Sequence, residues 1–160
     1  MERKTKVHAE DGKQEIFITR EFELPVDLLF RAYSDPELFQ EWMSHEYGQC
    51  KVVKYESRNH GGWHFQTVSR EGKVLFQAHG VFHAVIPGRR IVRTFEMNDS
   101  SFAPQLEFLE FENTGDDTSK LTLHMVFQSV GMRDEMLKLP FVQGLNMAYD
   151  RLQSIVSKLK

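Results

Sequence analysis

The sequence lacks most of the motifs from which a catalytic or redox site can be recognised. It has one cysteine, Cys50, so no internal disulfide can form, and a lone thiol is typical of a reducing compartment. It has no glycine-rich phosphate loop, no CxxC pair, no HExxH and no GxSxG. These absences exclude the enzyme classes that the motifs define. We therefore predict no metal and no cofactor.

Long apolar runs and an excess of positive charge are also missing. The apolar stretches are only a few residues long, such as Leu28 to Phe30, whereas a membrane-spanning helix needs about 20. The 20 Lys and Arg residues against 23 Asp and Glu give a net charge of −3, which does not favour nucleic acid as a partner. We expect a cytoplasmic protein without a membrane span, as a monomer or a weak dimer.

Large apolar side chains are abundant: the 160 residues include 13 Phe, 4 Tyr, 2 Trp and 7 Met. A chain of this length has the size of one domain and can bury enough surface to be stable without a disulfide or a metal. Bulky side chains in this number either fill a thick core or line a hollow one. We predict a flexible lead-in over residues 1–14 and a single domain over residues 15–160.

The hydrophobic pattern predicts one strand, two short helices, six strands and a final helix. Residues 15–22 alternate as a half-buried strand does, and helical spacing follows in residues 26–33 and again between a cap at Ser34 or Asp35 and Met43. Period-two alternation then predicts strands at 50–57, 62–69, 74–86, 90–97, 105–112 and 120–127. The short turns between them favour an antiparallel meander.

The C-terminal region is predicted to be helical. Residues 132–139 allow a first segment before Pro140, and apolar residues then recur every three or four positions from Phe141 to Leu159. Only the apolar face of a curved sheet is large enough to cover this stripe. The fold class predicted is therefore α+β, a helix-grip arrangement in which a curved antiparallel sheet of about seven strands, in the order β-α-α-β6-α, grips a long C-terminal helix.

Three segments carry a resemblance to a known family: REFELPVDLLFRAYSDPELFQEWM from Arg20, GGWHFQ from Gly61 and GMRDEMLKLPFVQGLNMAYDRLQSIV from Gly131. With the order of elements, they resemble the START-like (SRPBCC) helix-grip superfamily, and within it the branch named for the activator of heat-shock protein 90 ATPase. The resemblance covers residues 15–159 and implies a cavity closed by the final helix. Lipid carriers, hormone receptors, polyketide cyclases and co-chaperone domains share this fold, so it implies no single activity.

The candidate site is the wall of this cavity. Residues 74–86 have one wholly apolar phase that mixes large and small side chains, as a concave sheet face does, and the final helix would approach that face. The alternative is that these side chains interdigitate in a dry core. The predicted ligand-binding residues are Trp63, Phe65, Phe76, Phe82, Arg93, Phe95, Phe108, Leu123, Met136, Phe141, Leu145 and Tyr149.

Arg93 is the charged member of this set. It shares its strand face with Phe95 and Met97, and if that face points inward the guanidinium needs an anion. Glu107, Glu110 or an acidic group of a ligand would supply one. If the opposite face points inward, Arg93 lies in water. The sequence leaves both arrangements open.

The seven histidines raise the possibility of a metal site. His79 and His83 are four residues apart on one predicted strand, which separates them by about 13 Å, too far for one ion. His64 and His124 lie on other strands and are expected to be solvated. The histidines therefore do not change the prediction that no metal is bound.

The most direct functional hypothesis is binding of an apolar or aromatic small molecule, such as a lipid, a polyketide or a flavonoid-like compound. Two alternatives remain at this stage. The family resemblance implies a chaperone-associated stress-response protein that acts on heat-shock protein 90. An aromatase or cyclase type of enzyme would instead use Tyr149 or His64 as a proton donor in the same cavity.

Overall fold

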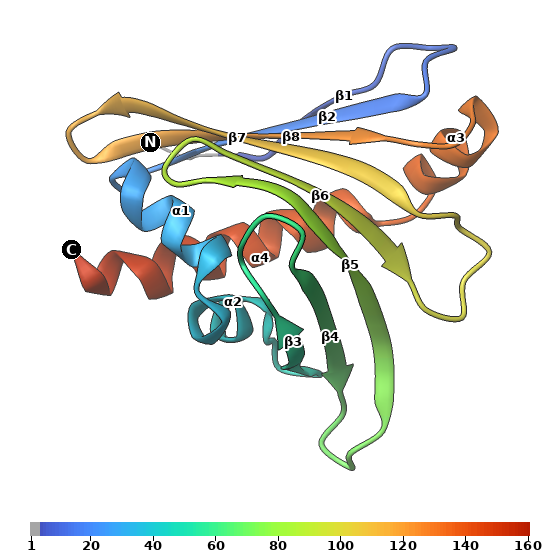
Figure 1. The fold of residues 1–160 in the computed structure, drawn as a ribbon, viewed down its shortest axis with the longest axis horizontal. Coiled ribbons are helices and arrows are strands. Elements are labelled where there is room, and N and C mark those ends of the chain that lie inside the picture. The colour runs from blue at the N-terminus through green and yellow to red at the C-terminus, as the bar shows by residue number, and fades with distance from the viewer. Residues whose placement is uncertain (1–3) are drawn as a thin grey trace.

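The computed structural model describes residues 4–160, which form one antiparallel sheet of eight strands with helices on one of its faces (Figure 1). The strand order is β1-β2-β8-β7-β6-β5-β4-β3, so strands β3 to β8 form a meander and β2 closes on β8. The strands are β1 Lys6–His8, β2 Glu15–Phe22, β3 Gln49–Tyr55, β4 Gly62–Val68, β5 Val74–Ile86, β6 Arg90–Met97, β7 Gln105–Gly115 and β8 Thr118–Val126.

The helices begin where the sequence supplies caps. Asp35 accepts a hydrogen bond from the amide of Glu37 at the start of α2, and Ser129 accepts one from the amide of Met132 in α3. Figure 1 shows α4 running below the curved sheet, with α1 and α2 beside its C-terminal half. The helices are α1 Val26–Ser34, α2 Pro36–Met43, α3 Val130–Leu137 and α4 Phe141–Val156, followed by the short 3-10 helix η1 Ser157–Leu159.

The core lies between the sheet and the helices. In β8, Leu121 and Leu123 are buried on the helix side, whereas Thr122 and His124 are half-buried on the other side. From α4, Tyr149 and other residues of its C-terminal half fill the same core. Burial of each large apolar side chain contributes about 1.5–3 kcal/mol to the free energy of folding. This burial is the main contribution that holds α4 against the sheet.

This architecture confirms the predicted α+β helix-grip fold, with eight strands in the described residues against about seven expected. None of the helices within residues 4–160 combines the length and the hydropathy needed to cross a membrane.

The additional strand lies inside the predicted flexible lead-in. Lys6, Val7 and His8 pair with Thr19, Ile18 and Phe17 of β2 and form the edge of the sheet. All three residues of β1 are exposed, so no buried phase marks the strand in the sequence. Backbone pairing with β2 forms the strand without requiring such a phase. Of the predicted lead-in, residues 1–3 lie outside the described residues.

Strand β5 also departs from the expected alternation. Ala78 and Phe82 point into the core as predicted, but the register between β5 and β6 shifts between Phe82 and Ala84. After this irregularity Val85 packs on the core and Ile86 is exposed. A bulge exchanges the two faces of a strand, which period-two alternation cannot anticipate. The uninterrupted apolar face predicted over residues 74–86 is therefore wrong beyond Phe82.

Candidate functional site

An aromatic cluster occupies the concave face of β4 and β5. Trp63 and Phe65 are buried and stack with ring centroids 5.8 Å apart, and the ring of Phe82 lies 6.0 Å from that of Trp63. Gly80 makes this arrangement possible. A Cβ at position 80 would lie 1.9 Å from the carbonyl oxygen of Thr94 and 2.7 Å from Nε1 of Trp63, so only glycine leaves room for the indole. The indole N–H donates to the same carbonyl, at 3.1 Å.

Arg93 points into this face, which resolves the orientation that the sequence left open. Its guanidinium carbon lies 4.5 Å from the ring centroid of Trp63 and 5.7 Å from that of Tyr33. Its Nε donates to Oε1 of Glu107 at 2.9 Å, and both side chains are buried. Burial lowers the pKa of Arg93, but the charge and hydrogen bond of Glu107 together with Tyr55 and Tyr33 raise it by more, so the net pKa lies above the ordinary value. Arg93 is therefore a buried cation with one carboxylate partner.

The hydrogen bonds around this pair are unevenly distributed. Gln105 donates to Oε2 of Glu107 at 2.8 Å, so both carboxylate oxygens are engaged. In contrast, Nη1 of Arg93 is buried and has no hydrogen-bond partner among the described residues. Buried polar groups are normally paired, because an unmade bond costs the full desolvation of the group. Both carboxylate oxygens of Glu107 are thus hydrogen-bonded, whereas Nη1 of Arg93 is not bonded to any described residue.

Three tyrosines border the pair. The hydroxyl of Tyr33 donates to that of Tyr149 at 3.3 Å, and the hydroxyl of Tyr55 donates to the backbone carbonyl of Tyr33. Burial raises the pKa of Tyr149 to about 12 and raises the pKa values of Tyr33 and Tyr55 as well. At neutral pH all three are therefore uncharged phenols, which can donate hydrogen bonds but do not add negative charge.

The surroundings of Arg93 are buried without being completely covered. Arg93 keeps 7% of its surface exposed, Glu107 4% and Leu123 5%, whereas Ile91 and Tyr149 are at 0%. Met136 of α3, at 5%, belongs to the same core cluster. The polar pair is thus buried, with only a small fraction of each side chain accessible.

The two halves of α4 cover the sheet differently. Phe141 and Leu145 in its first half are only partly buried, as is Phe95 on the sheet. In its second half, Tyr149 and Leu152 are completely buried. The apolar interior is therefore least covered near the start of α4.

Two of the predicted site residues are not gathered with the others. Phe108 lies on the convex face, where it stacks on His124 with ring centroids 5.5 Å apart. Both phases of residues 105–112 carry apolar side chains, and Leu109 and Phe111 occupy the inward one. Phe76 contacts Phe65 but is 37% exposed near the end of β5. The other ten of the twelve lie on the concave face of the sheet or on the helices that cover it.

The sequence reasoning did not assign Tyr33, Tyr55 or Gln105 to the site, and it offered Glu107 only as one of several partners for Arg93. A usable signal was present for Gln105 and Glu107, which share a phase with Leu109 in β7. For Tyr33 no comparable signal exists, because its place beside Arg93 depends on how α1 packs on the sheet.

The remaining titratable groups do not form a second chemical centre. His64, His79 and His124 bond to Gln77, Glu96 and Glu15. Among residues 4–160, no group of three or more His, Cys, Asp or Glu is placed to hold a metal ion. Burial raises the pKa of the Cys50 thiol to about 12, so it stays protonated and is a poor nucleophile.

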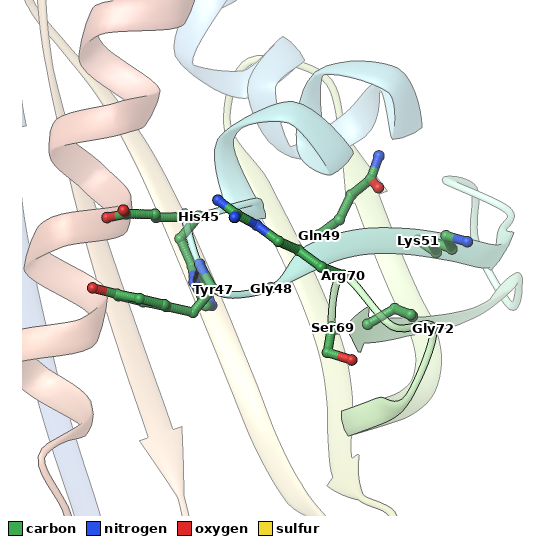
Figure 2. A pocket seen from close by; sticks show the side chains of 10 residues that line it. His45, Tyr47, Gly48, Gln49, Lys51, Ser69, Arg70 and Gly72 are labelled. Atoms are coloured by element: carbon green, nitrogen blue, oxygen red, sulfur yellow. Dashed lines mark hydrogen bonds between the residues drawn. The ribbon is translucent and has the colours of Figure 1, made fainter.

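A separate surface pocket of about 340 Å³ lies between the loop after α2 and the turn that joins β4 to β5 (Figure 2). Lys51 and Arg70 contribute positive charge to its wall, and Tyr47 is largely exposed. The full lining is His45, Glu46, Tyr47, Gly48, Gln49, Lys51, Val68, Ser69, Arg70 and Gly72. With a single aliphatic side chain in its wall, this pocket does not suit an apolar molecule.

Comparison with known proteins identifies the family. A family model described as "Activator of Hsp90 ATPase homolog 1-like protein" matches residues 23–157. The chain belongs to this family. Membership confirms the resemblance carried by the segments around Pro25, Trp63 and Gly131, which the matched range contains except for residues 20–22. A search of curated proteins found no match.

Solved structures show the same fold as this family member. Protein Ms6760 from Mycobacterium smegmatis is 18% identical with a TM-score of 0.83, over 98% of this chain and 99% of that one. A protein from Rhodobacter sphaeroides is 15% identical with a TM-score of 0.87, over 97% and 99%. CalU16 from Micromonospora echinospora is 21% identical with a TM-score of 0.61, over 98% and 85%. At these identities the likeness concerns the fold alone.

Proposed function

We propose that this protein binds an apolar or aromatic small molecule between the concave face of its sheet and α4. The observation that carries the proposal is the buried Arg93–Glu107 pair, in which Nη1 of Arg93 has no hydrogen-bond partner within residues 4–160. A buried guanidinium is costly unless its donors are paired, so an acceptor from outside the chain would be stabilised at this position.

The residues around the pair suit a ligand with an apolar body. Trp63 and Phe82 lie beside Arg93 on the sheet, and Leu123 of β8 and Met136 of α3 belong to the same apolar core. Ligand sites typically combine such walls with a few polar groups that orient the bound molecule. A lipid, a polyketide or a flavonoid-like compound has this chemistry.

The start of α4 is the part of the wall through which we propose that the ligand enters. Phe95 on β6 and Phe141 and Leu145 on α4 are partly buried, so small movements of the helix would uncover the interior there. Ordered packing at the other end of α4, where Leu152 is fully buried, would hold the helix in place during entry.

Substitution of Leu145 tests the site. In Leu145→Trp the larger ring should narrow the proposed entrance and weaken binding of the neutral fluorescent probe N-phenyl-1-naphthylamine about tenfold or more. Met147→Trp is the matched control, because Met147 lies on the same helix and is 61% exposed. Dissociation constants from fluorescence titration measure the effect. Equal affinities in both variants and the parent protein would place the probe elsewhere and contradict the site.

Mass spectrometry of the protein purified under native conditions tests the function itself. We expect a small apolar molecule to co-purify, and to be displaced by an excess of the naphthylamine probe. Protein that carries no such molecule and does not bind the probe at high micromolar concentration would rule the proposal out.

Association with a chaperone is a second candidate. The family description names an activator of the Hsp90 ATPase, and β5 exposes Val74 and Leu75 at its start, where a partner can reach them. Chaperone ATPase turnover with and without this protein is the measurement. A stimulation that Leu75→Glu abolishes supports the candidate, and unchanged turnover removes it.

A further inference from the structure

The donors of Arg93 define what the ligand must offer. A guanidinium has five N–H groups and no acceptor. Its Nε is bonded to Glu107, and its guanidinium carbon lies 4.5 Å from the ring centroid of Trp63 and 5.7 Å from that of Tyr33. Contact with an aromatic ring does not use the in-plane N–H groups of a guanidinium, and Nη1 of Arg93 has no hydrogen-bond partner among the described residues. The missing group is therefore a hydrogen-bond acceptor that lies near the guanidinium plane.

The charge around Arg93 is already balanced. Glu107 neutralises it, and both oxygens of that carboxylate are held in hydrogen bonds. Within the part of the chain that the structure describes, the other two buried arginines, Arg20 and Arg133, pair with Asp150 and Asp134, although Nε of Arg20 also has no hydrogen-bond partner there. A ligand carboxylate would thus be a second anion beside a single cation in a low-dielectric interior, where like charges repel strongly. This balance of charge favours a ligand with an uncharged hydrogen-bond acceptor over a ligand with a carboxylate.

Tyr149 provides a second donor in the same region. Its hydroxyl accepts from Tyr33, and its own proton has no acceptor among the described residues. The positive charge of Arg93 lies close enough to lower the pKa of Tyr149, although burial raises it by more. A carbonyl oxygen has two lone pairs and can accept from two donors at once.

We propose that the bound molecule carries a neutral carbonyl oxygen, as a ketone or an ester does, which accepts a hydrogen bond from Nη1 of Arg93. This inference rests on the proposed function and narrows it. It places aromatic ketones and esters, such as uncharged polyketide-like compounds, ahead of free fatty acids and other carboxylates.

Three probes of similar size test the proposal on the unmodified protein: 2-acetylnaphthalene, 2-isopropylnaphthalene and 2-naphthoate. Isothermal titration should give a dissociation constant for the ketone about tenfold lower than for the carboxylate. It should also be about tenfold lower than for the hydrocarbon, after the affinity of the hydrocarbon is corrected for its more favourable free energy of transfer out of water. The carbonyl stretch of the bound, ¹³C-labelled ketone should lie at lower wavenumber than in hexane, because hydrogen bonding weakens the C=O bond.

Replacing the pair separates the hydrogen bond from general affinity. In Arg93→Met with Glu107→Met, which removes both charges together, the preference for the ketone should disappear while the hydrocarbon still binds. Should this variant fail to fold, the infrared shift in the parent protein still decides the question. Tightest binding of 2-naphthoate, or a carbonyl stretch unchanged from hexane, would overturn the inference alone. Failure of all three probes to bind would overturn the proposed function and this inference with it.

Discussion

At the scale of single residues, the site contains positions where the surrounding atoms allow little substitution. Gly80 is the clearest case, because the backbone of Thr94 and the indole of Trp63 occupy the space that a side chain would need. Arg93 is a second, since its burial is acceptable only with Glu107 beside it. Both residues lie in the concave face, where a ligand would make contact.

Replacement of Gly80 by alanine should destabilise the protein by about 2 kcal/mol or more, because the new Cβ would overlap a backbone oxygen that cannot move freely. Gly144→Ala is the control. Nothing lies within 4 Å of a Cβ at position 144, and alanine should stabilise α4 there by about 0.5–1 kcal/mol. Urea unfolding measures both changes, and a Gly80→Ala variant as stable as the parent would contradict the packing described.

The two phases of β7 show why part of the site could not be found from sequence. Leu106 and Phe108 are as apolar as Leu109 and Phe111, and the phase of Phe108 was expected to face inward. In the structure the phase of Leu109 and Phe111 faces the core, and Gln105 and Glu107 are buried because they share that phase. For β8 the alternation was unambiguous, and Leu123 was correctly placed inside. A strand is predictable to the extent that only one of its phases can be buried.

At the scale of elements, the short helix α3 contributes residues to the core and holds a neighbouring segment of the chain. Helix α3 is eight residues long and holds Met136 and Arg133 in the core. Arg133 donates to the backbone carbonyls of Glu10 and Glu15, so α3 also holds the chain next to β2. Its start depends on Ser129, whose hydroxyl accepts from the amide of Met132.

Ser129→Ala should cost about 0.5–2 kcal/mol of stability, because the amide of Met132 loses its capping acceptor. The loss should be local first, with faster amide hydrogen exchange in α3 than in α4. Ser154→Ala serves as the control, since Ser154 is an exposed residue inside α4 whose hydroxyl makes no cap. Unchanged exchange in α3 would show that packing rather than the cap holds this helix.

The sequence was more informative for elements than for their contacts. The helix of residues 141–156 and the strand of residues 15–22 were recognised from their periodicity. Strand β1 was missed because its three exposed residues have no buried phase, and the irregularity in β5 was missed because period-two counting assumes an unbroken register. In both cases a neighbouring strand determines the structure.

At the scale of the whole molecule, the buried phenols link folding to alkaline pH. Burial raises the pKa of Tyr149 to about 12 and raises those of Tyr33 and Tyr55, whereas unfolded tyrosines titrate at about 10. Above about pH 10 the unfolded chain loses these protons while the folded chain keeps them. Unfolding is thus favoured as the pH rises through this range.

The free energy of unfolding should therefore decrease from about pH 10 to about pH 12, by up to about 1.4 kcal/mol per pH unit for each such tyrosine. Tyr149→Phe should reduce the slope, since one proton-linked group is removed. Tyr47→Phe, at a position that is 76% exposed, should leave the slope unchanged. Denaturant midpoints across this pH range provide the measurement, and identical slopes in all three proteins would contradict the link.

The amino-acid sequence by itself determined the order of strands and helices from β2 onward, the α+β class and the family, because alternation, helical spacing and caps are local properties. The tertiary structure alone decided that Arg93 faces inward, that it meets Glu107 rather than Glu110, and that Tyr33 and Tyr149 meet beside it. The physical reason is that a buried charge takes its environment from strands and helices distant in the chain, and only packing brings these together.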